Sequence, residues 1–339
     1  MEEIFMRRAF DLAANGRGKV SPNPMVGCVI VKDGKVIGEG WHKVYGGPHA
    51  EVNAIASVAD KSLLDGADIY VTLEPCAHYG KTPPCAELLI KYPFRKVIIA
   101  NTDPNPLVAG KGIQLLQDYG LDVTSGMLSE YGERFNARFF TYIREKRPYI
   151  ILKWAETADG FVAHSDYSSK WISGKVSRML VHKWRTEEDA IAVGKNTALY
   201  DNPQLNTRDW PGKNPVRVVI DRKLELPAHL SLFDGSQKTL CYNLLKDEEK
   251  GPVSFVKLSE ENFLQALLTN LHQRNLQSLI VEGGSVLLNL FLSGGLYDEV
   301  RIFKAPHTFE QGIPAPAMRG KPAEQIKIEE DELWVYYKK

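Results

Sequence analysis

The chain has 339 residues, with 42 basic and 42 acidic side chains and therefore a formal net charge of zero. Hydrophobic residues make up 44% and charged residues 25%, which is the composition of a folded globular protein and excludes a mainly disordered one. Residues 1–146 carry 17 basic and 17 acidic side chains and the remainder carries 25 of each, so we expect neither a nucleic-acid nor an anionic-membrane partner.

The first part of the chain alternates helical patterns with short apolar runs. Helices are expected at residues 5–14, 50–59, 86–91 and 112–119, and strands at 26–31, 36–37, 69–73, 96–100 and 121–124. The pair Asp33-Gly34 between two apolar runs predicts a β-hairpin. This order of elements predicts a three-layer α/β domain over residues 1–146.

The charged segment 144–148 ends in a proline and precedes a new strand, so we place the domain boundary there. Strands are then expected at 149–154, 190–193, 216–221 and 279–282, and helices at 260–274 and 286–292. The alternation predicts a second, mostly parallel sheet with its own site over residues 147–339.

The cysteines and the N-terminus indicate the compartment. Four cysteines in a chain of this length do not make a disulfide framework. Residues 1–8 lack the order of a secretory signal, and the longest apolar runs are too short to span a bilayer. We therefore expect a cytoplasmic protein without a membrane partner.

Three residues of the first domain are candidate metal ligands: His49, Cys76 and Cys85. One histidine and two cysteines fill three positions of a tetrahedral zinc ion and leave the fourth for water. Glu51, two residues after the histidine, can move protons without binding the metal. Zinc deaminases carry His-x-Glu followed by Pro-Cys-x-x-Cys, whereas eight residues separate the two cysteines here, so the intervening stretch must loop out.

Two other interpretations of these residues stay open at this point. A buried cysteine is usually an inert small hydrophobic residue, and a His-x-Glu pair also occurs by chance. A closed structural zinc site would need a fourth ligand, which His42 or His78 could supply.

Four segments of the first domain, in order, closely resemble the bifunctional deaminase–reductase family of riboflavin biosynthesis. They are residues 21–28, 49–51, 74–85 with its Thr-Pro-Pro-Cys end, and 103–112. The resemblance implies a cytidine-deaminase-like fold that deaminates a diaminopyrimidinone ribosyl phosphate. It implies one zinc ion per chain on His49, Cys76 and Cys85, with Glu51 as the catalytic proton shuttle. The implied substrate contacts are Asn23, His42, His78, Lys81 and Asn105.

Segments of the second domain resemble the reductase half of the same family, although no Gly-x-Gly-x-x-Gly motif follows a strand. These segments are residues 153–160, 169–173, 201–205 together with Arg208, and 282–284. The resemblance implies a dihydrofolate-reductase-like α/β fold and NADPH-dependent reduction of the ribosyl group to a ribityl chain. The implied cofactor contacts are Ala155, Trp171, Thr197, Asp201, Gly284 and Ser285. The implied substrate contacts are Lys153, Ser169, Arg185, Leu205, Arg208 and Glu282.

Two local features bear on the expected cofactor site. Many members of the family carry Ser-Leu where this chain has Thr157-Ala158, but the Asp159-Gly160 turn is kept. Arg222 and Lys223 follow the 216–221 strand, near the expected adenosine end of the cofactor. Either residue could hold the 2′-phosphate of NADPH, or both could be ordinary surface charges.

Two rival functions differ from this interpretation. One is a deaminase of free nucleotides or of tRNA with an attached scaffold domain, but a tRNA deaminase needs a basic face, which the charge balance does not offer. The other is a structural zinc module joined to a ligand-binding domain, and Glu51 disfavours it, because a closed site has no use for a proton shuttle. Small-molecule substrates and a homo-oligomer are both compatible with the sequence.

Overall fold

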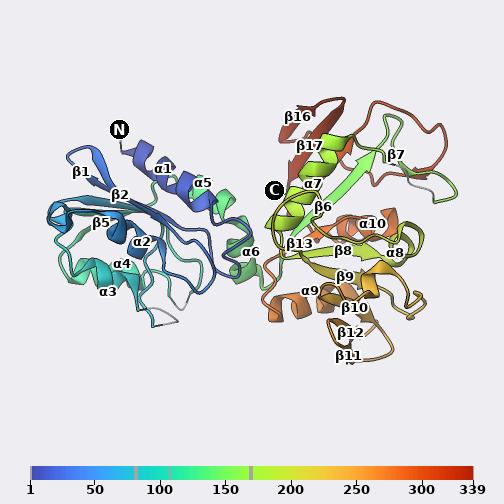
Figure 1. Cartoon of the computed structure of the whole chain (residues 1–339), viewed down its shortest axis with the longest axis horizontal. Helices are drawn as coiled ribbons and strands as arrows, with labels where there is room; N and C mark the ends of the chain where they lie inside the picture. The colour runs from blue at the N-terminus through green and yellow to red at the C-terminus, as the bar shows by residue number, and fades with distance from the viewer. Residues whose placement is uncertain (1, 80–82, 107, 168–170, 339) are drawn as a thin grey trace. The chain divides into compact units, whose positions relative to one another are not determined.

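The computed structural model describes residues 2–79, 83–106, 108–167 and 171–338. The chain folds into two compact units, Met1–Lys146 and Arg147–Lys339 (Figure 1). Within the described ranges, every helix is too short or too polar to cross a membrane.

A five-stranded sheet with strand order β2-β1-β3-β4-β5 forms the middle layer of the first unit. Its strands are β1 (Gly27–Lys32), β2 (Lys35–Trp41), β3 (Asp68–Leu73), β4 (Lys96–Asn101) and β5 (Asp122–Ser125). β1 pairs antiparallel with β2 and β3, whereas β3, β4 and β5 are parallel. The predicted hairpin is confirmed, and both Asp33 and Gly34 have positive φ (49° and 73°), as its tight turn requires.

Helices cover both faces of this sheet. They are α1 (Glu3–Ala14), α2 (Ala50–Ser57), α3 (Cys85–Leu89), α4 (Lys111–Asp118), α5 (Ser129–Phe135) and α6 (Ala137–Glu145), with a 3-10 turn at Lys61–Leu64. Because side chains alternate along a strand, Ile30 and Val71 pack with α2, α3 and α4, whereas Val29 and Tyr70 pack with α1 and the residues around α5. The predicted three layers are confirmed. The sequence pattern missed α5 and α6, since Gly132 lies inside α5 and few of their residues are buried.

Helix α2 lies directly on strand β2, and a glycine makes this approach feasible. A Cβ atom at Gly40 would lie 2.2 Å from the Ala54 backbone nitrogen and 2.4 Å from the Ala50 carbonyl oxygen. Any larger residue would push α2 away from the sheet. This contact fixes the start of α2, which carries His49 and Glu51.

A ten-stranded sheet with order β11-β12-β10-β9-β8-β13-β6-β14-β17-β16 forms the second unit. Its strands are β6 (Tyr149–Glu156), β8 (Ala190–Gly194), β9 (Val216–Ile220), β10 (Thr239–Asn243), β11 (Glu248–Lys250), β12 (Val253–Lys257), β13 (Ser278–Val281), β14 (Glu299–Lys304), β16 (Glu324–Ile328) and β17 (Asp331–Tyr337). β7 (Phe161–Ala163) and β15 (Ile313–Pro314) form a separate pair. The strands from β12 to β14 are parallel, which confirms the mostly parallel sheet. Strand β11 at one end of the sheet and strands β17 and β16 at the other were not predicted, and each pairs antiparallel with its neighbours.

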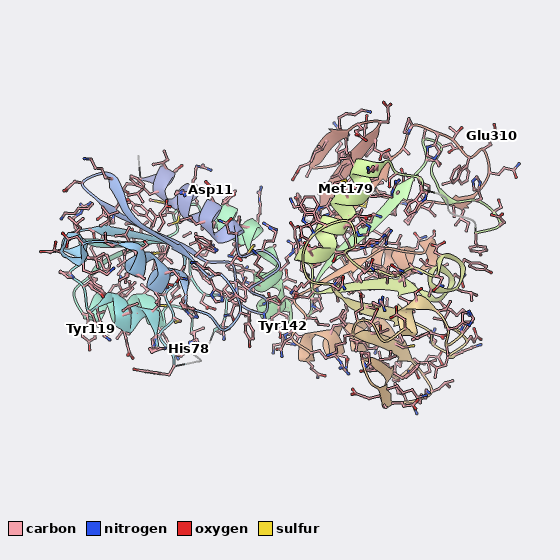
Figure 2. All side chains as sticks on the ribbon, in the orientation of Figure 1. Asp11, His78, Tyr119, Tyr142, Met179 and Glu310 are labelled. Atoms are coloured by element: carbon pink, nitrogen blue, oxygen red, sulfur yellow. The ribbon has the colours of Figure 1, made fainter. Side chains whose placement is uncertain are left out.

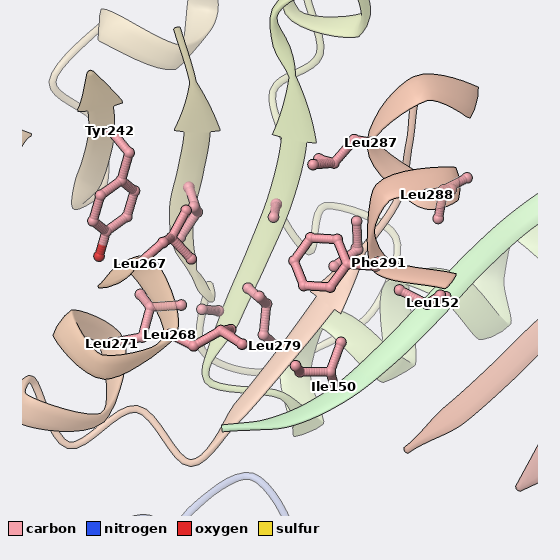
Figure 3. Packing of buried hydrophobic residues seen from close by; sticks show 14 of the residues in the cluster. Ile150, Leu152, Tyr242, Leu267, Leu268, Leu271, Leu279, Leu287, Leu288 and Phe291 are labelled. Carbon is pink, nitrogen blue, oxygen red and sulfur yellow. The ribbon is translucent and has the colours of Figure 1, made fainter. Parts of the chain in front are cut away.

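The helices of the second unit are α7 (Lys175–Glu187), α8 (Lys195–Asp201), α9 (Phe263–Gln273) and α10 (Ser285–Ser293), with a 3-10 turn at Ser231–Phe233. Helices α9 and α10 were predicted. Their buried leucines and Phe291 belong to one core cluster with Ile150 and Leu152 of β6, and the α9 leucines lie beside Tyr242 and Leu279 (Figure 3). Helix α7 covers the opposite face, where Trp184 stacks on Phe303 at 5.5 Å between ring centroids. Because β6, β8, β9 and β13 are parallel, their carboxyl ends share one edge of the sheet, where α/β proteins bind ligands.

Candidate active sites

His49, Cys76 and Cys85 form a compact donor cluster in the first unit. Their ligand atoms all lie within 4.8 Å of one another. His49 Nδ1 is 3.6 Å from Cys76 Sγ and 3.3 Å from Cys85 Sγ. A tetrahedral zinc ion with bonds of about 2.0–2.3 Å holds its ligands roughly 3.5–3.8 Å apart, so the cluster fits zinc in both spacing and donor type.

Helix starts present two of the three donors. His49 is the N-cap residue of α2, and Cys85 is the first residue of α3. Cys76 follows β3, and its sulfur accepts a hydrogen bond from the Cys85 backbone N–H at 3.3 Å. Hydrogen bonds with the Cys85 thiol and with His49 lower the pKa of the Cys76 thiol. A thiolate, the form that binds zinc, is therefore favoured here.

Glu51 lies on the first turn of α2 with 3% of its surface exposed. Burial raises the pKa of its carboxyl group, which interacts with Cys76, His49 and Cys85. Among the residues that the structure describes, the donor cluster contains neither Glu51 nor the two alternative ligands, His42 and His78. Within these residues, three donors therefore surround the metal position and the fourth direction has no protein ligand.

Two of the predicted deaminase substrate contacts lie beside the cluster and bind each other. His42 is buried, and its ring lies edge-on to that of His49 at 5.4 Å. His42 Nδ1 is 3.1 Å from the Pro48 carbonyl oxygen, so the ring donates there, and Nε2 then accepts from the Asn23 amide at 3.1 Å. Burial lowers the pKa of His42, which favours this neutral form.

The remaining predicted contacts of the first unit lie on two loops. His78 is exposed at the margin of the unit, two residues after Cys76 (Figure 2). Asn105 follows β4, and its backbone N–H donates to Asp103 Oδ1 at 2.8 Å. Burial raises the pKa of Asp103. The Asp103 backbone N–H donates to Glu74 Oε2 at 3.1 Å, and Glu74 lies two residues before Cys76, so this loop is next to the loop that carries a metal ligand. Lys81 lies outside the described residues.

A cavity of about 1480 Å³ opens at the carboxyl ends of β6, β8, β9 and β13 in the second unit. The predicted contacts that line it are Lys153, Ala155, Trp171, Arg185, Thr197, Asp201, Leu205, Arg208, Glu282, Gly284 and Ser285. Ser169 lies outside the described residues. The fold thus gathers residues from across the unit around one space that is large enough for a nucleotide cofactor and a substrate.

A buried charge network lies in the wall of this cavity. Glu282 accepts two hydrogen bonds from Arg185, at 3.0 Å from Nε and 2.8 Å from Nη2, and Lys153 Nζ lies 3.9 Å from Glu282 Oε2. Burial by itself would raise the pKa of Glu282, but the charges of Arg185 and Lys153 lower it to about 2. Burial also lowers the pKa of Lys153. The cavity therefore holds a fixed carboxylate beside an ammonium group.

The two arginines expected at the substrate phosphate differ in their surroundings. Arg185 uses Nε and Nη2 on Glu282 and Nη1 on the Asn206 carbonyl oxygen at 3.0 Å, which leaves two of its five N–H donors. The Arg208 side chain is 43% exposed. His182, which the sequence did not single out, also holds Asn206, with Nδ1 3.0 Å from its carbonyl oxygen.

An aromatic rim and a glycine turn complete the cavity wall. Tyr167 and Tyr200 stack at 4.6 Å with an interplanar angle of 8°, and Trp171 is 67% exposed. The turn before α10 lies close to α8, since a Cβ atom at Gly284 would be 3.0 Å from Thr197 Oγ1. Flat aromatic surfaces and a helix start with free backbone N–H groups suit the rings and phosphates of a dinucleotide.

Comparison with known proteins matches each half of the chain to a protein family. Residues 148–336 match the RibD C-terminal domain, and residues 1–101 match the cytidine and deoxycytidylate deaminase zinc-binding region. A riboflavin biosynthesis protein RibD of Aquifex aeolicus (strain VF5) is 39% identical over 323 residues, which cover 92% of this chain and 89% of the relative.

Two solved structures are similar over nearly the whole chain. RibD of Acinetobacter baumannii (form 1) superposes with a TM-score of 0.91 at 35% identity, covering 99% of this chain and 98% of that one. A Thermotoga maritima protein described as a diaminohydroxyphosphoribosylaminopyrimidine deaminase/5-amino-6-(5-phosphoribosylamino)uracil reductase superposes with a TM-score of 0.89 at 38% identity, covering 98% and 97%.

Proposed function

The chain belongs to the RibD family of bifunctional deaminase–reductases of riboflavin biosynthesis, and on this premise we propose a reaction for each unit. The first unit deaminates the diaminohydroxyphosphoribosylaminopyrimidine named for the Thermotoga relative. The second reduces the ribosyl group of the resulting 5-amino-6-(5-phosphoribosylamino)uracil to a ribityl chain with NADPH. The observation that carries the proposal is the three-donor cluster with the buried Glu51 carboxyl beside it.

In the first unit, His49, Cys76 and Cys85 would hold one zinc ion. A zinc ion bound there would lower the pKa of water to about 7 and so make hydroxide available at neutral pH. Glu51 would take one proton from the attacking water and pass it to the ring nitrogen, then take the second from the newly formed hydroxyl group and pass it to the amine, which leaves as ammonia. Its burial supports the role, because a raised pKa lets the carboxyl group hold a proton between two transfers.

The other residues of the first site position the substrate. Asn23 and the neutral His42 exchange their mutual hydrogen bond for bonds to the pyrimidine. Asn105 and His78 approach from the loops that follow β4 and β3. Lys81 keeps its predicted role as a phosphate contact.

In the second unit, Trp171, Thr197 and the Gly284–Ser285 turn would hold NADPH, which would supply the hydride. Lys153 donates a hydrogen bond to the sugar oxygen that gains charge, and Glu282 holds Lys153 and Arg185 in place. The exposed fork of Arg208 binds the substrate phosphate. Ala155, Asp201, Leu205 and Ser169 keep their predicted contacts with cofactor and substrate.

The preference for NADPH over NADH depends on a cation near the adenosine ribose. Arg222 donates to Glu260 at 2.7 Å and lies over the Phe263 ring, so a protein carboxylate already balances its charge. Lys223 is exposed and lines the cavity. We therefore assign the 2′-phosphate to Lys223. A cytoplasmic location, the lack of a nucleic-acid partner and a homo-oligomeric state stay predictions.

Ammonia release by the purified chain tests the function directly. The Glu51→Gln variant should keep its zinc and lose deamination by about 10²- to 10⁴-fold, the usual contribution of a general acid–base group. The variant should still reduce substrate that was deaminated beforehand, because the reductase cavity lies wholly within the other unit. Full ammonia release by Glu51→Gln would contradict the mechanism, and a matched loss of both activities in a folded protein would contradict two separate sites.

A further inference from the structure

Glu74 is a buried carboxylate that has no part in the chemistry proposed above. It follows the last residue of β3 and is 6% exposed. Its Oε2 atom accepts backbone hydrogen bonds from Asp103 at 3.1 Å and Gly110 at 3.0 Å. Its Oε1 atom accepts from Gly112 at 2.9 Å and Ile113 at 3.3 Å. One side chain thus binds four amides of a single segment, residues 103–113.

That segment meets the zinc-ligand loop at a second point. Gly112 lies against Pro75, where an added Cβ atom would be 2.0 Å from the Pro75 carbonyl oxygen. Pro75 and Glu74 directly precede Cys76 in the chain. The 103–113 segment is therefore fixed to the residues that present a metal ligand, by four hydrogen bonds and by close backbone packing.

The chemistry of this contact requires a carboxylate. Two ionised oxygens offer about four acceptor positions, which matches the four N–H donors. Hydrogen bonds to an ionised acceptor are roughly twice as strong as neutral ones. A glutamine has the same shape, but its NH₂ group would face two of these N–H groups, so two of the four bonds would be lost.

We propose that Glu74 is a positioning residue for the deaminase substrate: it holds the 103–113 segment so that Asn105 contacts the pyrimidine ribosyl phosphate beside the metal ligands. The inference rests on the proposed deaminase function. It goes beyond that function because Glu74 contacts neither the metal position nor the reacting atoms and acts only through the segment that carries Asn105.

The test uses the full chain and three variants, Glu74→Gln, Asn105→Ala and the double variant. Zinc content, the KM and kcat of ammonia release, and reductase activity are measured for each. Glu74→Gln should raise the KM about tenfold or more, with kcat within about threefold, zinc retained and reduction unchanged, as expected when charge-assisted bonds that only position a contact are lost. The double variant should be no worse than Asn105→Ala, since residues that act as one unit are not additive.

A matched control and a second variant complete the test. Glu130→Gln makes the same chemical change at an exposed position on α5 and should leave every value unchanged. Gly112→Ala attacks the same contact from its other side and should reproduce the rise in KM, so it replaces Glu74→Gln if that variant does not fold. The proposal would be overturned if both Glu74→Gln and Gly112→Ala kept the wild-type KM. It would also be overturned if the effects of Glu74→Gln and Asn105→Ala on KM added fully in the double variant, or if Glu74→Gln lost its zinc. Failure of the unmodified chain to release ammonia would instead refute the proposed deaminase function.

Discussion

The two units build their sites in opposite ways. In the first unit, His49 and Cys85 are 36 residues apart, and helix starts and one loop bring their donor atoms together. In the second unit, Arg185 and Glu282 are 97 residues apart and meet only because α7 packs on the sheet next to the carboxyl end of β13. The first site is a set of ligands that needs a metal, whereas the second is a cavity in which one buried carboxylate already holds two cations in place. Loss of a ligand should therefore damage the first site, and loss of a charge should damage the second.

The largest expected effect follows the removal of a metal ligand. Cys85→Ala leaves two donors, too few for a stable zinc site, so zinc should be lost and deamination should fall by at least about 10³-fold. Reduction should stay within about twofold, because the second unit has its own core. Elemental analysis and separate assays of the two reactions measure this.

Cys28→Ala is the matched control, because Cys28 is buried in β1 and lies outside the donor cluster. It should keep its zinc. If Cys85→Ala retained a full equivalent of zinc, the donor assignment would be wrong.

A smaller effect is expected from breaking the charge network of the second unit. Glu282→Gln leaves Arg185 and Lys153 buried without their carboxylate, and removal of one partner from a buried ion pair costs about 3–5 kcal/mol of unfolding free energy. Denaturant unfolding of the second unit measures the loss. Glu260→Gln is the control, because Glu260 forms an exposed pair with Arg222, and such pairs contribute only about 0–1 kcal/mol.

The same variant predicts a pH dependence with a defined sign. The pKa of Glu282 is about 2 in the folded protein, below its ordinary value of 4.5. The carboxylate therefore stabilises the fold above pH 4.5, and this contribution is lost as the pH falls toward 2. The difference in unfolding free energy between wild type and Glu282→Gln should shrink over that range. A difference that stayed constant down to the lowest pH at which the protein folds would exclude a charge effect.

Cofactor choice is expected to depend on a single exposed cation. Lys223→Ala should raise the KM for NADPH about 10-fold and leave that for NADH nearly unchanged, since one charge-assisted contact contributes roughly 1.5 kcal/mol or more. Arg222→Ala should change the ratio of the KM values for NADPH and NADH less, because Arg222 already donates a hydrogen bond to Glu260. Steady-state kinetics with both cofactors measure this. Equal use of NADPH and NADH by the unmodified enzyme would contradict the cofactor assignment itself.

The smallest expected effect concerns the departure from the family pattern at Thr157. Its hydroxyl group accepts a hydrogen bond from the Phe161 backbone N–H at 3.0 Å and donates to Asp159. A serine can make both bonds, so Thr157→Ser should cost only the burial of one methyl group, about 0.8 kcal/mol, because Thr157 is buried. Thr157→Val removes both and should cost roughly 1–2 kcal/mol. Denaturant unfolding measures both variants. Equal unfolding midpoints for Thr157→Ser and Thr157→Val would show that the hydroxyl group does not stabilise this turn.

The sequence by itself determined what depends on neighbouring residues. The hairpin at Asp33-Gly34, most helices and strands of the first unit and the central parallel strands of the second followed from local patterns. Residue types made the ligand trio and Glu51 candidates for a zinc site, and the family resemblance assigned their roles, since the spacing of the two cysteines departs from the usual pattern. Family resemblance, and not spacing, supplied the contacts of the reductase cavity, and the roles of Lys81 and Ser169 stay predictions.

Only the tertiary structure decided what depends on distant residues meeting. It excluded His42 and His78 from the donor cluster within the described residues, a choice that spacing had left open. It paired Arg185 with Glu282 in a buried ion pair, whereas the Arg208 side chain is partly exposed. It also brought the Glu74 carboxylate within hydrogen-bonding distance of four backbone N–H groups in a segment that begins about thirty residues further along the chain. Pairings of this kind arise from the packing of whole elements, and such packing leaves no periodic signal in the sequence around either partner.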